Sequence, residues 1–223
     1  MPDTGRFAMA VRRVTTSSRS IIGSFPSLKN GQPVSYQSTI ERDLLYFLEY
    51  DTTVCCYTMQ PFVIKGTDAE GVPHTYTPDI LVERTTRRTV VECKPAAKRD
   101  HPHTQQQVAL GQAWADANGC DFVLITDADL RTGHRLANLK LLWRYARLAV
   151  PQAVTDRCLR VLTREPAGIP FHALISALDG VAPSLNLAPC LYALLFQHVL
   201  KTDLDHPLTS TSLLTHIGAP LRA

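Results

Sequence analysis

Apolar and polar residues follow one another in short, regular runs along the first part of the chain. From Ile40 to Leu48 the apolar residues recur at helical spacing, and Ser38 precedes them at the position of a helix N-cap. This pattern predicts a helix over residues 39–50. Beyond it, runs rich in β-branched and aromatic residues predict four strands around a turn at residues 68–71. These strands are residues 54–59, 61–65, 76–82 and 88–93.

The next part of the chain alternates between helical and strand-like runs. Thr104 stands at the N-cap position of a helix predicted over residues 105–118, and Gly119 follows it as a C-terminal stop. Residues 121–126 form an apolar run typical of a buried parallel strand, and a second amphipathic helix is predicted over residues 134–147. A helix between two strands supplies the crossover that a parallel pair requires. The order of elements therefore indicates an α/β fold with a mixed sheet.

Near Pro151 the chain changes character. Three further helices are predicted, and Asn186 caps the last of them. After them, a hairpin-like pair of strands flanks a polar turn. The helices are residues 151–164, 170–178 and 187–197, and the strands are residues 198–202 and 208–213. Three helices and a β-wing predict a small winged-helix-like domain. The N-terminal segment lacks periodicity and is rich in Ser, Thr and Arg, so we expect an extended arm. The expected divisions are an arm at 1–35, a mixed-sheet domain at 36–149 and a winged-helix-like domain at 150–223.

Composition narrows the class of protein without defining its function. The chain has 223 residues, of which 45% are hydrophobic and 19% are charged, and these values are ordinary for a globular protein. No apolar run reaches the length of a membrane span, and the first residues lack the apolar segment of a signal peptide. The six cysteines form no C-x-x-C pair, so we expect reduced, mostly buried thiols in a cytoplasmic protein. The pair His101 and His103 is better explained as a polar loop before a helix than as a zinc site.

Positive charge is concentrated in the part of the chain that precedes residue 148. The net charge is only +3, but residues 1–30 hold five basic residues against one acid, and residues 84–99 hold six against one. Residues 131–147 hold five basic residues and no acid, whereas five of each sign balance from residue 148 onward. This distribution suits a phosphate-backbone partner. Any one cluster alone is better explained as a solvated surface, and it is the occurrence of three clusters around the candidate site that favours a phosphate partner.

Two of the predicted strands carry acidic and basic residues that could together form a catalytic site. Asp79 lies in one strand, and Glu92 and Lys94 lie two residues apart in the next. Side chains alternate faces along a strand, so Glu92 and Lys94 point the same way while Cys93 points the other. If the strands pair, Asp79 meets both residues across the ladder. This is the pattern of a PD-(D/E)XK nuclease, here Pro78-Asp79 and Glu92-Cys93-Lys94. Two edge strands with solvated charges are the alternative.

The residue types in this pattern fit a magnesium centre that hydrolyses phosphodiesters. Magnesium prefers hard oxygen ligands, and one or two carboxylates plus substrate phosphate usually hold it. The metal polarises the phosphate, and a nearby lysine can orient water and stabilise developing charge. Glu41 is a candidate third carboxylate from the first helix. Because Ser38 and Glu41 also match a capping box, a purely structural role for Glu41 stays open on this evidence.

Further sequence features make the chain resemble the TnsA family, the endonuclease subunit of heteromeric cut-and-paste DNA transposases. The resemblance covers roughly residues 20–145. It is carried by Ser38-Thr-Ile-Glu41-Arg42-Asp43, Leu48-Glu49-Tyr50-Asp51, Tyr57-x-x-Gln60-Pro61-Phe62, Tyr76-Thr77-Pro78-Asp79, Val91-Glu92-Cys93-Lys94-Pro95, Ile125-Thr126-Asp127 and Asn138-Leu139-Lys140-Leu141-Leu142. It implies a restriction-endonuclease-like mixed-sheet core. It also implies catalytic roles for Glu41, Asp79, Glu92 and Lys94, with Mg²⁺, or Mn²⁺ in its place, held by Glu41, Asp79, Glu92 and the backbone carbonyl of Cys93. Some family members have glutamine where this chain has Glu92, and the added charge should tighten metal binding.

The resemblance also implies partners and a cellular context. Family members cut the 5′ strand ends at the borders of a transposon, while a separate integrase-like transposase cuts and joins the 3′ ends. We therefore expect double-stranded DNA at transposon ends, that transposase, and a regulatory AAA+ ATPase contacted by the C-terminal domain. The expected location is the bacterial cytoplasm, close to the nucleoid, with no membrane association. Two alternatives are a stand-alone restriction- or repair-type nuclease and a catalytically silent assembly module of the transposase.

Overall fold

The computed structural model describes residues 23–67, 71–181 and 186–216. The chain forms two compact units, and the boundary between them falls between Leu130 and Arg131. Most of the predicted arm and of the predicted turn at 68–71 lie outside the described residues.

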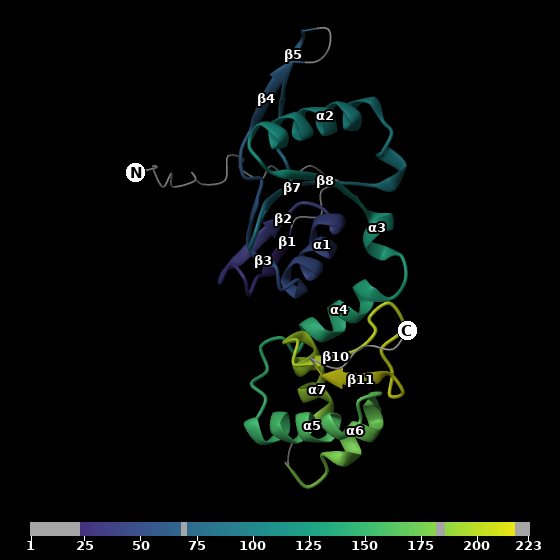
Figure 1. Ribbon diagram of the computed structural model, residues 1–223. Coiled ribbons are helices and arrows are strands. Elements are labelled where there is room, and N and C mark those ends of the chain that lie inside the picture. The colour runs from purple at the N-terminus through teal and green to yellow at the C-terminus, as the bar shows by residue number, and fades with distance from the viewer. Residues whose placement is uncertain (1–22, 68–70, 182–185, 217–223) are drawn as a thin grey trace, which may run out of the picture. The chain divides into compact units, whose positions relative to one another are not determined.

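A four-stranded mixed sheet forms the centre of the first unit, in the strand order β3-β6-β7-β8 (Figure 1). Its strands are β3 (Val54–Met59), β6 (Ile80–Arg84), β7 (Arg88–Lys94) and β8 (Asp121–Thr126). The first three pair antiparallel, whereas β7 and β8 pair parallel. The helix between those two strands, α2 (Pro102–Ala117), supplies the crossover. The α/β fold with a mixed sheet is therefore confirmed.

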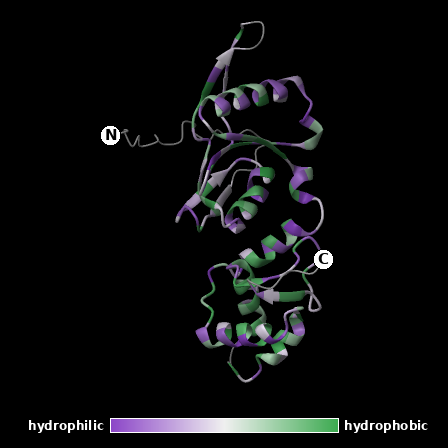
Figure 2. Ribbon diagram, viewed as in Figure 1, coloured by the Kyte–Doolittle hydropathy of each residue, from purple (hydrophilic) through white to green (hydrophobic). Residues whose placement is uncertain are grey.

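Two helices cover opposite faces of this sheet (Figure 1). α1 (Thr39–Tyr50) begins at the N-cap Ser38 as predicted and buries Leu44, Leu45 and Leu48. α2 shows hydrophilic and hydrophobic residues in alternation (Figure 2). It approaches β8 closely through Gly111, where an added Cβ atom would lie 2.2 Å from the ring of Phe122. Any larger residue at that position would push the helix away from the sheet.

The helix boundaries differ from the prediction around α2. The N-cap is His101 and not Thr104, which lies buried in the first turn of the helix. Pro102 at the first helical position explains the earlier start, because proline lacks the N–H that this position leaves unpaired. Two short helices were not predicted. They are the 3₁₀ helix η1 (Ala96–Lys98) and α3 (Asp127–Arg131). Strand β8 is parallel as expected but only half-buried, since it lies at the edge of the sheet.

The run predicted as a single strand over residues 76–82 is divided in the structure. Its first part ends β5 (Pro73–Tyr76), which pairs with β4 (Ile64–Thr67) in a separate two-stranded sheet. Its second part is β6, which belongs to the central sheet. Pro78 lies between them and has no N–H to offer to a ladder, so the strand is interrupted there. As a result Asp79 lies at a bend immediately before β6.

The expected arm is wrong for its last residues, because β1 (Gly23–Pro26) and β2 (Pro33–Tyr36) form an antiparallel hairpin. The turn between them is tied to the sheet and to α1. The Asn30 amide group donates to the Tyr57 carbonyl at 2.7 Å and accepts from the Tyr57 N–H at 3.1 Å. Ser27 and Tyr57 both donate to the buried Glu49 carboxylate, at 2.5 and 2.6 Å. Ser27 and Asn30 are separated from these partners by 22 and 27 residues, whereas Glu49 and Tyr57 are eight residues apart.

The described residues of the second unit form four helices and a small antiparallel sheet in the order β10-β11-β9. Its helices are α4 (Arg135–Trp143), α5 (Gln152–Arg164), α6 (Phe171–Ala177) and α7 (Leu187–Phe196), and its strands are β9 (Ile169–Pro170), β10 (Leu200–Lys201) and β11 (Leu213–His216). Fully buried leucines from α5, α6, α7 and β11 form its core. Asn186 caps α7 as predicted, with its side chain accepting from the Ala188 N–H at 3.2 Å.

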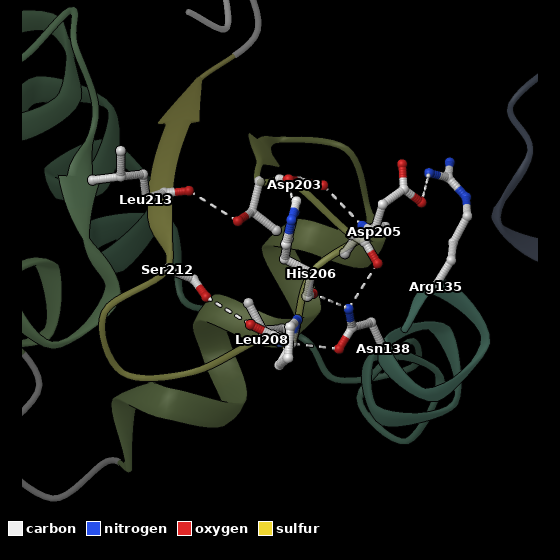
Figure 3. A network of polar contacts seen from close by, with 11 residues as sticks. Arg135, Asn138, Asp203, Asp205, His206, Leu208, Ser212 and Leu213 are labelled. Atoms are coloured by element: carbon white, nitrogen blue, oxygen red, sulfur yellow. Dashed lines mark hydrogen bonds and ion pairs between the residues drawn. The ribbon is translucent and has the colours of Figure 1, made fainter. Parts of the chain in front are cut away.

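One asparagine fixes the long connection between β10 and β11 (Figure 3). Asn138 on α4 is 5% exposed, and its amide nitrogen donates to the carbonyls of Leu204 at 2.8 Å and His206 at 2.7 Å. Its amide oxygen accepts from the Leu208 N–H at 3.1 Å. The connection therefore receives three hydrogen bonds from a single side chain. This network explains structurally why an asparagine stands at this position.

The second unit departs from the prediction in its strands. The hairpin partner of β10 is β11 at Leu213–His216, and not the predicted segment 208–213, because residues 208–212 are occupied by the Asn138 contact and by a polar turn closed by the Thr209 N–H to the Ser212 hydroxyl at 2.9 Å. Strand β9 was not predicted. Helix α4 belongs to this unit, whereas the predicted boundary at 149/150 assigns it to the preceding domain. The functional domain limits stay a prediction. No helix among the described ranges is both long and apolar enough to cross a membrane.

Candidate active site

The pairing of β6 with β7 brings the carboxylate of Asp79 to the strand that carries Glu92 and Lys94. Ile80 pairs with Val91 in the antiparallel ladder, so Asp79 comes opposite the residues that follow Val91. The Cys93 N–H donates to Asp79 Oδ2 at 2.7 Å. The predicted meeting of these residues across the ladder is therefore present in the structure, although Asp79 lies at a bend and not within a strand.

Glu92 and Lys94 point to the same face of β7, as strand alternation predicts. Lys94 Nζ lies 2.5 Å from Glu92 Oε1. The Glu92 side chain is 1% exposed, and its other oxygen, Oε2, accepts a hydrogen bond from the Tyr76 hydroxyl at 2.8 Å. Both oxygens of this buried carboxylate therefore have a partner, one charged and one neutral.

Glu41 joins this cluster from the first turn of α1, and its hydrogen bonds also hold the segment that leads into the helix, whose N-cap is Ser38. Its backbone N–H donates to the Ser38 hydroxyl at 3.1 Å, and its own Oε2 accepts from the Gln37 N–H at 2.9 Å. The side chain is buried, and the charges of Glu92 and Lys94 both act on it. The catalytic and structural roles that the sequence left open for Glu41 are thus compatible, because one carboxylate holds the segment before the helix and adjoins the cluster.

Burial and mutual repulsion dominate the electrostatics of the three carboxylates. Burial raises the pKa of Asp79 well above its ordinary value, and the charges of Glu92 and Glu41 raise it further, against the lowering effect of the Cys93 N–H. Burial also raises the pKa of Glu41, although the Gln37 N–H and the Ser38 hydroxyl oppose this shift. Such upward shifts are typical of functional sites, since a stable fold seldom retains unneeded like charges.

Lys94 supplies the positive charge of the cluster. Burial alone would lower the pKa of Lys94, but the charge and hydrogen bond of Glu92, together with the charge of Asp79, outweigh that effect and raise it. Lys94 is therefore an ammonium at neutral pH, and it can donate hydrogen bonds and stabilise negative charge. It is not suited to accept a proton.

The donor set fits a magnesium ion in chemistry. Three carboxylates face one ammonium, so the cluster carries an excess of negative charge that a divalent cation would offset. Within the described ranges no three His, Cys, Asp or Glu side chains stand together as a ready metal site. Magnesium needs only one or two carboxylates, with water and phosphate oxygens completing its coordination. Asp79 with the neighbouring Cys93 carbonyl and Glu41 meets that need.

Arginines of the basic segment 84–99 are partly engaged in ion pairs. Arg84 pairs with Asp51, and Arg87 Nη1 lies 2.9 Å from Asp121 Oδ1. The first pair joins the end of β6 to the end of α1, and the second joins the residue before β7 to the first residue of β8. The histidine pair also has a structural role, since His101 caps α2 by accepting from the His103 N–H at 3.3 Å. All six cysteines are free, and four of them are buried, as expected.

Sequence reasoning assigned no role to two residues beside the cluster. Tyr76 orients Glu92 through its hydroxyl, and Gln60 takes a left-handed backbone conformation with φ 47° while its N–H donates to the Asp79 carbonyl at 2.8 Å. A tyrosine shortly before the motif aspartate was a usable signal for the first. Nothing local in the sequence indicates the second, because left-handed backbone is uncommon for residues other than glycine.

One segment of the chain is similar to a known protein family. No curated protein matches the chain. Residues 51–127 match the family model described as TnsA-like endonuclease N terminal. The match includes Asp79, Glu92 and Lys94 and begins after Glu41. Endonuclease domains of this kind act on DNA. Residues 51–127 of this chain are therefore similar to the TnsA-like endonuclease N-terminal domain, and this similarity suggests a nuclease of the TnsA kind.

Proposed function

We propose that the protein is a Mg²⁺-dependent DNA endonuclease that serves as a subunit of a heteromeric transposase and cuts the 5′ strand ends at transposon borders. The observation that carries the proposal is the convergence of Glu41, Asp79, Glu92 and Lys94 on one buried site of a TnsA-like domain. Resemblance to the TnsA family beyond the matched segment, at Ser38–Asp43 and Asn138–Leu142, supports the transposase role.

Each residue of the cluster has a separate role in phosphodiester hydrolysis. Asp79, Glu41 and the Cys93 carbonyl would hold the metal, with Glu92 as a further acidic ligand. A bound Mg²⁺ would supply Lewis-acid stabilisation of the negative charge on the phosphate. Lys94 orients the attacking water and stabilises the charge that develops as the phosphate becomes five-coordinate. Tyr76 keeps the Glu92 carboxylate in place while Lys94 turns toward substrate.

The second unit is proposed to be a winged-helix-like partner domain. Helices α5, α6 and α7 together with the sheet β10-β11-β9 supply the elements of such a domain. From residue 148 onward five basic and five acidic residues balance, which supports a protein partner for that part of the unit, whereas the five basic residues at 131–147 suit a phosphate backbone. The regulatory AAA+ ATPase of the transposition system is the partner we propose, alongside the integrase-like transposase for the protein as a whole. A cytoplasmic, nucleoid-associated location follows from these partners.

Metal binding is the first test, because a free subunit can be inactive until its partners assemble. Calorimetric titration of Mn²⁺ into the full chain, with and without a short DNA duplex, is expected to show saturable binding. Asp79→Ala should abolish it while the far-UV circular dichroism stays that of the wild type. Asp116→Ala, an exposed acid on α2, is the matched control and should bind as the wild type does.

The possible results separate the candidate functions. Binding that depends on Asp79 justifies cleavage assays with the reconstituted transposase, in which Asp79→Ala should cut no 5′ strand. Wild-type cleavage by Asp79→Ala would refute the assigned site. Cleavage by the free chain without partners would favour a stand-alone nuclease. The absence of metal binding even with DNA would favour an assembly module without catalytic activity.

A further inference from the structure

A pocket of roughly 300 Å³ lies beside the catalytic cluster. Residues of the β1–β2 hairpin, the start of α1 and the end of β3 form its walls, and Glu41 is one of them. Because Glu41 also interacts with the charges of Glu92 and Lys94, the pocket adjoins the site where we place hydrolysis. A group bound in it would lie next to the phosphate being cut.

The lining of this pocket is rich in uncharged groups that both donate and accept hydrogen bonds. Gln32, Gln37 and Gln60 contribute amides, and Ser35 and Thr58 contribute hydroxyls. Within the described part of the chain, no residue hydrogen-bonds to the side-chain amides of these three glutamines. They are therefore available to a ligand. Apolar surface from Val34 and Met59 completes the walls.

The chemistry of the lining selects among the parts of a DNA strand. Glu41 is the one charged residue among those that line the pocket, so a phosphate would meet no positive partner there. Deoxyribose within a strand has no free hydroxyl and would leave the amides unpaired. A nucleobase has donors and acceptors on its edge and a flat apolar face, and glutamine amides pair readily with base edges. The lining therefore fits a base better than the other two groups.

Gln60 lines this pocket from a strained backbone position. Its φ of 47° is uncommon for a residue with a side chain, and the bond from its N–H to the Asp79 carbonyl maintains that conformation. The same bond links the pocket wall to a catalytic residue. Strain that is retained beside an active site commonly serves to position a group.

We propose that this pocket receives a nucleobase of the cleaved strand, taken out of the stack at a nucleotide next to the cut phosphate. Gln60 and Gln37 contact the edge of that base, and seating it places the adjacent phosphate at the catalytic cluster. The proposal rests on the proposed nuclease function. Enzymes that do chemistry on a base extrude it into a pocket and read its edge by hydrogen bonds, and the proposal applies the same mode of recognition to a base next to the cut phosphate.

An abasic scan tests the proposal with the full chain and a DNA duplex. One abasic nucleotide is placed in turn at each position around the cut, and cleavage in Mn²⁺ is compared with that of intact DNA. For the wild type, one position beside the cut should lower kcat/KM about tenfold, the value of one good amide–base contact. Gln60→Gly and Gln37→Ala should cut intact DNA about tenfold more slowly and lose sensitivity to that position.

The variants are chosen so that folding is preserved. Glycine adopts positive φ without strain, so Gln60→Gly keeps the backbone of the turn. Gln37→Ala keeps the N–H that caps Glu41. Gln60→Asn retains an amide and should keep part of the base sensitivity. Gln112→Ala on α2, an exposed glutamine remote from the pocket in sequence, is the control and should behave as the wild type.

Each result decides between the pocket and the nuclease function. Equal sensitivity of wild type and variants to every abasic position overturns the pocket while leaving the nuclease function intact. If the wild type cuts no DNA without its partners, the metal titration above decides on the nuclease function, and fluorescence anisotropy of the same duplexes in Ca²⁺ decides on the pocket. Base-dependent binding that Gln60→Gly loses supports it, and binding that ignores the missing base overturns it.

Discussion

Asn138 in the second unit and the carboxylate cluster in the first unit are both buried polar sites, but their groups are matched in different ways. Both N–H groups of the Asn138 amide find carbonyl partners, and its oxygen accepts an N–H. In the cluster, three carboxylates share one ammonium, and burial raises the pKa of Asp79 and Glu41. The comparison shows how a buried polar group can serve either the fold or the chemistry. A neutral, matched network holds a loop in place, whereas an unmatched excess of like charge prepares a site for a cation.

Glu41 sharpens this comparison because it belongs to both categories. Glu41→Gln keeps an oxygen that can accept from the Gln37 N–H, while Glu41→Ala removes it. Both variants should lower cleavage about a hundredfold by removing a charged ligand. Only Glu41→Ala should also lower the free energy of unfolding, by about 1 kcal/mol, as loss of one hydrogen bond does. Chemical denaturation and cleavage assays measure the two effects. A stable Glu41→Gln with full cleavage would restrict Glu41 to capping.

Asn138→Ala removes the fully paired hydrogen-bond network of the second unit. It leaves the carbonyls of Leu204 and His206 and the N–H of Leu208 without their partner. We expect a loss of about 2–3 kcal/mol in the free energy of unfolding, the usual cost of unpaired buried groups. Urea denaturation measures it, and Gln197→Ala, an exposed amide of the same unit, is the control. Unchanged stability would show that water replaces the side chain at no cost.

The pH dependence of stability reports on the buried carboxylates of the first unit. A carboxyl whose pKa is raised on folding binds its proton more tightly in the folded state, so stability falls as pH rises from the ordinary carboxyl range through the folded pKa. Asp79→Asn should flatten this fall, because it removes the group with the larger shift. Mg²⁺ should oppose the fall in the wild type, since it binds the charged form. Thermal unfolding across pH measures all three. A fall of equal size in Asp79→Asn would place its origin elsewhere.

Much of the catalytic cluster was predictable because strand geometry is regular. Alternation placed Glu92 and Lys94 on one face, and antiparallel pairing brought Asp79 to them. The capping role of Glu41 followed from its spacing to Ser38, but its approach to the cluster needed the packing of α1 against the sheet. The left-handed conformation of Gln60 was not predictable, since it is imposed by a bond to Asp79, 19 residues further along the chain.

The elements that sequence reasoning missed depend on distant partners. The β1–β2 hairpin is anchored by Glu49 and Tyr57, which no local pattern near Asn30 reveals. The hydrophobic pattern predicted one strand over residues 76–82, but Pro78 interrupts it because proline has no N–H for a ladder. Strand β9 has only two residues, which is too short for any periodicity to show.

Two backbone hydrogen bonds of the cluster have a spectroscopic consequence. The Gln37 N–H ends on Glu41, and the Cys93 N–H ends on Asp79. Each amide proton therefore senses the ionisation and metal occupancy of the carboxylate that accepts it. In a ¹H–¹⁵N correlation spectrum of the labelled protein, these two resonances would follow proton and cation binding separately at the two acids. The fold thus provides an intrinsic, residue-resolved indicator of the state of its own active site, without any added label near the chemistry.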